Sequence, residues 1–152
     1  MNNSLPNFRE ARIEDAREIT EIMSRGYHQN WEPDYYKKLI SDNNSFVYVL
    51  SLVEEIVGFI TGKKAENTCD IYMLVIDINH RRKGFANLLL YKTIVALSAL
   101  QISEFFLEVA ETNNQAINLY KKYGFRAVSR RIGYYKILNE NIDAIVYRLV
   151  NK

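Results

Sequence analysis

The spacing of apolar residues divides the chain into helices and strands. Apolar side chains recur every three or four positions over residues 13–27, which predicts a helix with one buried face. The stretch DIYMLVI, residues 70–76, is an unbroken apolar run after its first residue and predicts a strand covered on both faces. The same patterns, with proline and glycine as boundaries, predict strands at 8–11, 45–53, 55–64, 70–76, 104–110, 125–131 and 142–150, and helices at 13–27, 33–40, 84–100 and 114–124.

This order of elements mixes hairpins with crossover helices. It predicts an α/β fold in which one mixed sheet of about seven strands packs with about four helices. The two strands before residue 65 should form a hairpin that turns at Glu54 and Glu55. Gly124 is well placed to end the fourth helix. Residues 1–152 should form a single domain.

Three cations run into a glycine where the third helix begins. In Arg81-x-x-Gly84-x-Ala86 the first-turn N–H groups have no partner within the helix and carry the positive end of its dipole, so they suit a diphosphate. Gly84 and Ala86 let a ligand approach the backbone closely. Arg82 and Lys83 add positive charge, which is unfavourable at this helix end unless an anion joins them. A solvated turn is the alternative, and a Walker loop is excluded because Gly-Lys-Ser/Thr is missing.

These residues lie in a longer resemblance to a known family. LVIDINHRRKGFANLLL is similar to the acyl-CoA-binding segment of the GCN5-related N-acetyltransferase (GNAT) superfamily, whose pattern is Arg/Gln-x-x-Gly-x-Gly/Ala. FFLEVAETNNQAINLYKKYGF resembles the segment that follows it in that fold. The similarity is closest to bacterial and archaeal N-terminal acetyltransferases that modify ribosomal proteins, and it covers residues 69–150. Relatives usually carry proline where Ile78 stands, so the turn before the cations should be looser here.

The resemblance implies acetyl-CoA as cosubstrate and no metal. The strand at Leu74, Val75 and Ile76 would diverge from its neighbour and pair through its backbone with the pantetheine arm. Asn113 matches an asparagine that contacts the pantetheine, although Asn is also a good helix N-cap and both roles can hold together. The turn and first helical residues would bind the pyrophosphate: Arg81, Arg82, Lys83, Gly84, Phe85, Ala86 and Asn87.

Glu108 and Tyr120 are the candidate catalytic residues. Strand alternation puts Glu108 on the face of Phe106, either at an open sheet edge or in a cleft. It matches the general base of the family, which is needed because an ammonium must lose a proton before it attacks. Spacing alone makes Tyr120 a core residue, whereas the resemblance implies that it protonates the departing thiolate. The amine would attack the thioester directly in a ternary complex, with a backbone amide of Val75 or Ile76 polarising the carbonyl.

Three aromatic residues are candidates for binding the acceptor. Tyr134 and Tyr135 match a tyrosine pair near the substrate entrance of N-terminal acetyltransferases, and the alternative is ordinary strand aromatics. Trp31 lies where relatives carry a tryptophan, and it either walls the cleft or anchors its loop. The basic residues Arg130, Arg131 and Lys136 form either a rim for an acidic peptide or ribosomal surface, or a solvated strand end.

Composition narrows the class of protein. The chain of 152 residues is 48% apolar with a net charge of +2, so a direct nucleic-acid role is not expected. His28, His80 and the one cysteine, Cys69, are not spaced for zinc, and both histidines should lie at the surface. No apolar run approaches the roughly 18–20 residues of a membrane span, and the start of the chain lacks an apolar signal core. A cytoplasmic monomer or homodimer is therefore expected.

Three functions remain open from the sequence. The first is acetylation of a protein N-terminus, with a ribosomal protein as a possible partner. The second is acetylation of a small amine such as a polyamine, an amino acid or an aminoglycoside. The third is an inactive CoA-binding sensor, which the presence of both Glu108 and Tyr120 counts against.

Overall fold

The computed structural model describes residues 5–27 and 31–151. The elements follow the predicted order, with two added 3-10 turns. Within the described ranges no helix has the length and apolar content needed to cross a membrane. The elements are β1 (Asn7–Glu10), η1 (Ile13–Asp15), α1 (Ala16–Gly26), α2 (Pro33–Ser41), β2 (Ser45–Leu52), β3 (Glu55–Ala65), β4 (Thr68–Ile76), η2 (Ile78–His80), α3 (Phe85–Ala99), β5 (Glu104–Ala110), α4 (Asn114–Lys122), β6 (Arg126–Ile137) and β7 (Glu140–Val150).

One seven-stranded sheet carries these elements, in the order β1-β2-β3-β4-β5-β7-β6. The β4–β5 pair is parallel and the other neighbouring pairs are antiparallel. The predicted mixed α/β sheet is therefore confirmed, including the crossover through α3 that a parallel pair requires.

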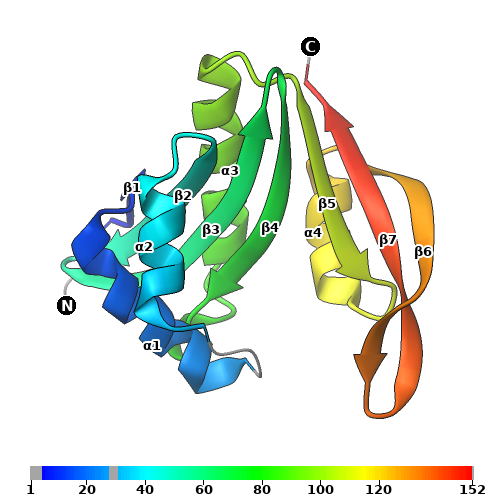
Figure 1. Ribbon diagram of the computed structural model, residues 1–152, viewed down its shortest axis with the longest axis horizontal. Coiled ribbons are helices and arrows are strands. Elements are labelled where there is room, and N and C mark those ends of the chain that lie inside the picture. Colours follow the sequence, from blue (N-terminus) through cyan, green and yellow to red (C-terminus); the bar gives the residue numbers. More distant parts are fainter. Residues whose placement is uncertain (1–4, 28–30, 152) are drawn as a thin grey trace.

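Helices cover both faces of the sheet (Figure 1). On one face α1 buries Ile19, Ile22 and Met23 against β2, β3 and β4. On the other face α3 and α4 pack on the larger core cluster, to which α3 contributes Leu89 and Leu90. Because α3 is apolar on much of its circumference, it can cover several strands at once.

The sheet forks between β4 and β5. Parallel pairing joins Thr68–Ile71 to Glu104–Leu107 and is not continued by the later residues of either strand. The register of β4 on β3 slips at this point, so that Tyr72 has no partner. Before this β-bulge Ile71 points to the α3 side, and beyond it Leu74 does. Because a bulge bends its strand, β4 turns away from β5, and Figure 1 shows the two diverging.

Several boundaries differ from the sequence prediction, and two of these differences concern the hairpins. The β2–β3 turn is Val53 and Glu54, one residue earlier than expected, because Leu52 pairs with Glu55. Strand β6 continues to Ile137, since it pairs with β7 along an extended hairpin that apolar periodicity did not show. Gly124 follows α4 with φ of 94°, which confirms it as the residue that ends this helix.

Candidate active site

A cleft of about 450 Å³ opens at the fork of the sheet. Its lining combines two carboxylates, one guanidinium, three tyrosines and apolar side chains from β4, β5, β6 and β7. The lining residues are Asp70, Ile71, Tyr72, Phe106, Leu107, Glu108, Arg131, Tyr134, Tyr135 and Val146. The fork thus brings Glu108 and the two predicted acceptor-site tyrosines into one cavity.

Glu108 lies in the cleft, which is one of the two positions left open by the sequence. Its side chain is 31% exposed and accepts a hydrogen bond of 2.5 Å on Oε1 from Nη1 of Arg131. The guanidinium carbon of Arg131 also lies 4.2 Å from the ring centroid of Tyr134. Hydrogen bonding to Glu108 raises the pKa of Arg131. Arg131 therefore belongs to the site, rather than to a solvated strand end.

A bulge in β6 directs Arg131 and Tyr134 toward the cleft. Arg131 pairs with Ala144 and Tyr135 with Ile142, so three β6 residues lie opposite a single β7 residue, Asp143. Gly133 takes φ of 63°, and its N–H donates to the Asp143 carboxylate at 2.8 Å. Asp143 therefore stabilises the backbone that presents the site residues.

Tyr120 of α4 lies in the larger core cluster and is not among the described residues that line the cleft, whereas Tyr135 lines it. Tyr120 is 9% exposed, and burial, with a smaller effect of Tyr135, raises its pKa to about 12. Burial also raises the pKa of Tyr135, and the negative charge of Glu108 adds to this shift. The Tyr120 hydroxyl is therefore protonated at neutral pH, as a hydrogen-bond donor to a leaving group must be.

The start of α3 has backbone donors without protein partners. Gly84 is the N-cap with φ of 79°, and it offers no side-chain hydrogen bond to the helix. The first intrahelical bond runs from Leu88 N–H to the Gly84 carbonyl, so the amides of residues 85–87 have no backbone acceptor within the described part of the chain. A Cβ added at Gly84 would meet no atom within 4 Å. The predicted turn is thus an open, uncapped helix start, with Arg82 and Lys83 exposed beside it.

The free edge of β4 follows from its pairing with β3. The Asp77 N–H donates to the Val57 carbonyl at 2.8 Å. In an antiparallel pair the backbone N–H and C=O groups of successive residues point alternately toward the partner strand and away from it. The backbone groups of Val75 therefore point toward β3, and those of Leu74 and Ile76 point toward the fork. Of the two amides expected to polarise a thioester, the register therefore favours that of Ile76.

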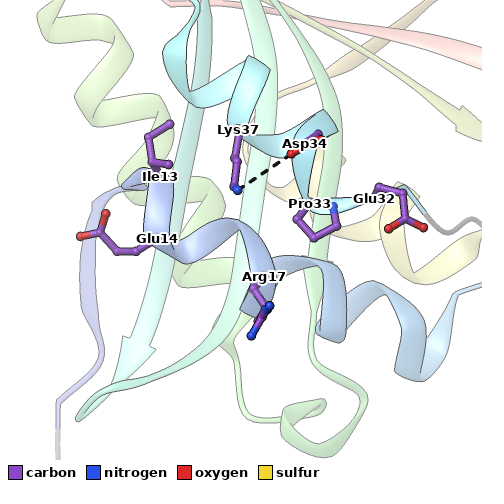
Figure 2. A pocket seen from close by; sticks show the side chains of 7 residues that line it. All are labelled: Ile13, Glu14, Arg17, Glu32, Pro33, Asp34 and Lys37. Carbon is purple, nitrogen blue, oxygen red and sulfur yellow. Dashed lines mark ion pairs between the residues drawn. The ribbon is translucent and has the colours of Figure 1, made fainter.

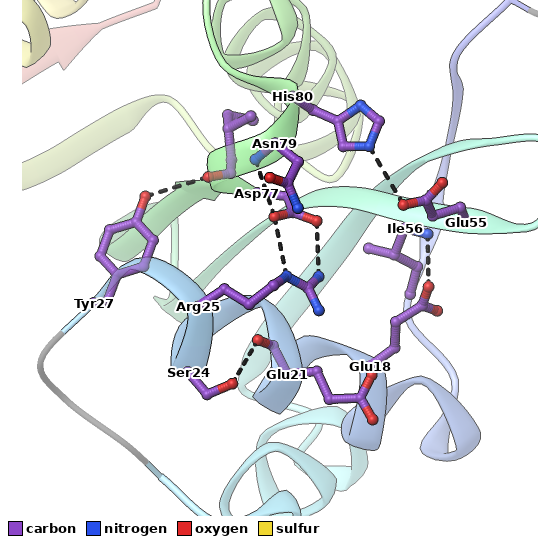
Figure 3. Close-up of polar contacts among 11 residues, drawn as sticks. Glu18, Glu21, Ser24, Arg25, Tyr27, Glu55, Ile56, Asp77, Asn79 and His80 are labelled. Atoms are coloured by element: carbon purple, nitrogen blue, oxygen red, sulfur yellow. Dashed lines mark hydrogen bonds and ion pairs between the residues drawn. The ribbon is translucent and has the colours of Figure 1, made fainter.

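Polar contacts fix the turn between β4 and the α3 start (Figure 3). Arg25 donates to both carboxylate oxygens of Asp77, at 2.7 and 3.2 Å. The Asn79 N–H donates to Asp77 at 3.3 Å, and Tyr27 donates its hydroxyl hydrogen to the Ile76 carbonyl at 3.4 Å. The end of α1 therefore holds the β4 end and the following turn.

His80 departs from its predicted surface position. Its side chain is only 16% exposed, because it packs beside Phe85, and its Nε2 lies 3.3 Å from the Glu55 carboxylate. Glu55, Asp77 and His80 bring possible ligand atoms within 4.8 Å of one another. The guanidinium of Arg25 is the cation that Asp77 binds there. His28 lies outside the described residues.

Two other predicted residues have structural roles. Asn113 is the N-cap of α4, since its Oδ1 accepts from the Ala116 N–H at 3.2 Å, and its contact with pantetheine stays a prediction. Trp31 stacks on Tyr35 with ring centroids 5.0 Å apart, and it is not among the described residues that line the cleft. Of the two roles expected for Trp31, a contact supports anchoring of its loop, and none supports walling of the cleft.

Sequence reasoning missed Asp70, Tyr72 and Phe106 in the cleft lining. The signal for Asp70 was present, because it is a carboxylate in a run of apolar strand residues, as Glu108 is. Asp70 could not be assigned to a face of β4, because nearly every later residue of the strand is apolar. The sequence therefore lacks the alternation of apolar and polar residues that distinguishes the two faces.

A second cavity, of about 690 Å³, lies between the start of α1 and α2 (Figure 2). Its lining mixes both signs of charge, and its one ion pair within the described ranges joins Lys37 and Asp34 at 3.9 Å. None of the predicted site residues lines it. The chemistry therefore belongs to the cleft at the fork.

Comparison with known proteins agrees with this geometry. The model of the acetyltransferase (GNAT) family matches residues 16–125. The chain is 30% identical over 150 residues to N-alpha-acetyltransferase 30 of Xenopus laevis, covering 93% of this chain and 54% of that protein. It is 27% identical to an N-alpha-acetyltransferase of Sulfurisphaera tokodaii, covering 84% of each chain. The chain thus spans about half the length of the Xenopus relative.

Solved structures show the same fold. The ribosomal-protein-S18-alanine N-acetyltransferase of Escherichia coli superposes with a TM-score of 0.90 at 20% identity, covering 97% of this chain and 96% of that one. Arabidopsis thaliana NAA60 in complex with a bisubstrate analogue superposes with a TM-score of 0.82 at 21% identity, covering 97% and 99%.

Proposed function

Because the chain belongs to the acetyltransferase (GNAT) family, we propose that it transfers the acetyl group of acetyl-CoA to the α-amino group of a protein N-terminus. The observation that carries this proposal is the fork between β4 and β5. The cleft of carboxylates and tyrosines opens there, and β4 leads from it to the uncapped start of α3. The relatives named as N-alpha-acetyltransferases support the choice of acceptor.

Acetyl-CoA would bind along the free edge of β4 and at the start of α3. The outward backbone groups of Leu74 and Ile76 can pair with the amides of the pantetheine arm as a neighbouring strand would. The unpartnered amides after Gly84 can take the diphosphate, and Arg82 and Lys83 can neutralise its charge. The thioester would then lie at the fork, next to the acceptor cleft.

The charges of the cleft suit an acceptor with a single ammonium. Asp70, Glu108 and Arg131 are its formally charged lining residues, and two negative charges with one positive leave −1. Because Glu108 forms an ion pair with Arg131, the cleft does not present the several free carboxylates that a polycation would need. Tyrosine hydroxyls and rings offer contacts to a peptide backbone and its first side chain.

In the proposed reaction a cleft carboxylate removes one proton from the acceptor ammonium. The neutral nitrogen attacks the thioester carbonyl carbon, and the Ile76 amide stabilises the oxyanion. The C–S bond then breaks, its electron pair goes to sulfur, and the second nitrogen proton is released as the amide forms. The Tyr120 hydroxyl donates a hydrogen bond to the departing thiolate. Free CoA and an N-acetylated chain are the products.

Release of free thiol from acetyl-CoA tests this function. The acceptors are short peptides with free N-termini, the same peptides with blocked N-termini, spermidine, lysine and an aminoglycoside. We expect thiol release with the free peptides and none with their blocked counterparts. Turnover of spermidine, lysine or the aminoglycoside without turnover of any peptide would contradict the peptide acceptor. Tight CoA binding without turnover of any acceptor would identify an inactive CoA-binding domain instead.

A further inference from the structure

Resting on the proposed function, we propose that Asp70 takes the proton from the acceptor ammonium, and that Glu108, held by Arg131, positions the ammonium. This division of roles differs from the one implied by the family resemblance, in which Glu108 is the base. It follows from the placement of both carboxylates in the same cleft and from the different partners that they have.

Asp70 and Glu108 lie diagonally across the β4–β5 pair at the point where its pairing ends. Asp70 pairs in register with Phe106, and Glu108 lies two residues further along β5, on the same face as Phe106. Both carboxylates line the cleft. An ammonium that enters the cleft can therefore contact both groups.

Glu108 is the carboxylate with a cationic partner. Its Oε1 accepts the hydrogen bond of 2.5 Å from Arg131, and it has no other hydrogen-bond donor among the described residues. A bound guanidinium orients a carboxylate and engages one of its oxygens. Glu108 is therefore suited to hold an ammonium in place, with its Oε1 already bonded to Arg131.

Asp70 has no hydrogen bond or ion pair with any described residue. Asp70 is an exposed residue, but partial desolvation of its carboxylate raises its pKa, and the negative charge of Glu108 raises it further. Both effects shift the pKa from its ordinary value toward the working range of a general base. Asp70 is therefore the carboxylate that is free to accept a proton.

The other titratable groups around Asp70 form no ion pair with it among the described residues. Lys63 of β3 is its register partner in the sheet, and no ion pair joins the two side chains. Arg148 of β7 binds Glu104. Burial raises the pKa of the cleft tyrosines Tyr72 and Tyr135, so both phenols are neutral near pH 7.

The proposed step conserves charge and atoms. One N–H bond of the ammonium breaks, its electron pair stays on nitrogen, and the proton forms an O–H bond on the Asp70 carboxylate. The neutral amine then attacks the thioester as described above. Asp70 releases its proton to solvent once the acetylated product has left.

The pH dependence of Asp70→Asn and Glu108→Gln separates the two roles. At pH 6.5 we expect Asp70→Asn to lower kcat/KM about 10²-fold, the lower end of the usual effect of losing a general base. This loss should shrink to less than about tenfold at pH 9.5, because an α-amine with a pKa near 8 is then mostly neutral. Glu108→Gln should cause a loss that stays constant over this range. The reverse pattern, with the shrinking loss in Glu108→Gln, overturns the proposal.

Two controls keep this test independent of folding and of turnover. Both substitutions are nearly isosteric, and calorimetry should give both variants the CoA affinity of the wild type. NMR titration of the Asp70 carboxyl carbon should give a lower pKa in Glu108→Gln than in the wild type, because a negative neighbour has been removed. An unchanged titration contradicts the carboxylate pair. A wild-type protein that acetylates no amine contradicts the proposed function, and the titration still decides whether the pair is coupled.

Discussion

The Tyr120 hydroxyl has a chemistry set by its burial. A pKa of about 12 lies well above the value near 8.5 of an ordinary thiol, so complete proton transfer to a thiolate would be uphill. A hydrogen bond to the charge that develops on sulfur costs no such transfer. Tyr120 is therefore better suited to stabilise the leaving thiolate than to protonate it fully, which refines the role implied by the family resemblance.

Tyr120→Phe should accordingly reduce turnover without weakening CoA binding. A hydrogen bond to a charged group contributes about 1.5–3 kcal/mol, so kcat should fall by roughly 10- to 100-fold. Steady-state kinetics and calorimetry with CoA measure the two effects separately. Since the pKa of this phenol is about 12, its ionisation should not lower wild-type turnover below about pH 11. Equal losses in kcat and in CoA affinity would show that Tyr120 acts through packing.

Asp70 and Glu108 also show how far single residues can be predicted. Both are carboxylates in apolar strands, and only the family resemblance, which matches Glu108 and assigns nothing to Asp70, favoured the cleft for Glu108. Residues 71–76 are all apolar, so the phase of β4 cannot be deduced from composition. Only the pairing of β4 with both neighbours places Asp70 in the cleft.

At the scale of elements, the turn after β4 depends on α1. Family relatives usually carry proline where this chain has Ile78, and a looser turn was expected. Asp77 is 1% exposed and binds Arg25 of α1, so a long-range ion pair fixes the backbone here. The sequence could not show this compensation, because the two residues are far apart in the chain.

Asp77→Asn should therefore lower the free energy of unfolding by about 1.5–3 kcal/mol at pH 7, the usual range for hydrogen bonds to charged groups. Burial alone would raise the pKa of Asp77, but hydrogen bonds from Arg25 and Asn79 lower it overall. A lowered pKa in the folded state gives stability that is present above the unfolded value near 3.9 and lost as the pH falls below it. The difference between wild type and variant should accordingly shrink below about pH 4.

Urea unfolding at several pH values measures this difference. Asp34→Asn is the matched control, since its carboxylate is 86% exposed and its contact with Lys37 is long at 3.9 Å. The control should change the unfolding free energy by less than about 0.5 kcal/mol. A loss in Asp77→Asn that persists undiminished at pH 3 would show that packing, and not ionisation, explains it.

At the scale of the whole molecule, hydrophobic periodicity was sufficient for the order of elements, the helix faces and the mixed sheet. The fork was expected only from the family resemblance, because a bulge is a property of two strands in register and leaves no periodic signal in one of them. The extended β6–β7 hairpin was missed for a related reason. Its β6 residues are almost all exposed, so burial imposes no apolar alternation on them.

The fork also predicts how the whole fold responds to CoA. The outward backbone amides of β4 beyond the fork and the first amides of α3 have no backbone acceptor among the described residues, and a ligand that binds only the folded state stabilises it by mass action. CoA at 100 times its dissociation constant should add about 2.7 kcal/mol, which raises the melting temperature of a chain of this size by about 5–10 °C. Thermal unfolding with and without CoA, followed by circular dichroism, measures the shift.

Two lysines of the same segment then separate specific phosphate contacts from general charge. At one fixed CoA concentration Lys83→Ala should give a smaller shift than the wild type, because Lys83 lies in the turn at the uncapped helix start. Lys92→Ala removes the same charge from an exposed position further along α3 and should keep the full shift. If both variants lose the shift equally, CoA senses only the net charge of the molecule. If the wild type shows no shift, the start of α3 does not bind a diphosphate, and the placement of acetyl-CoA along β4 fails with it.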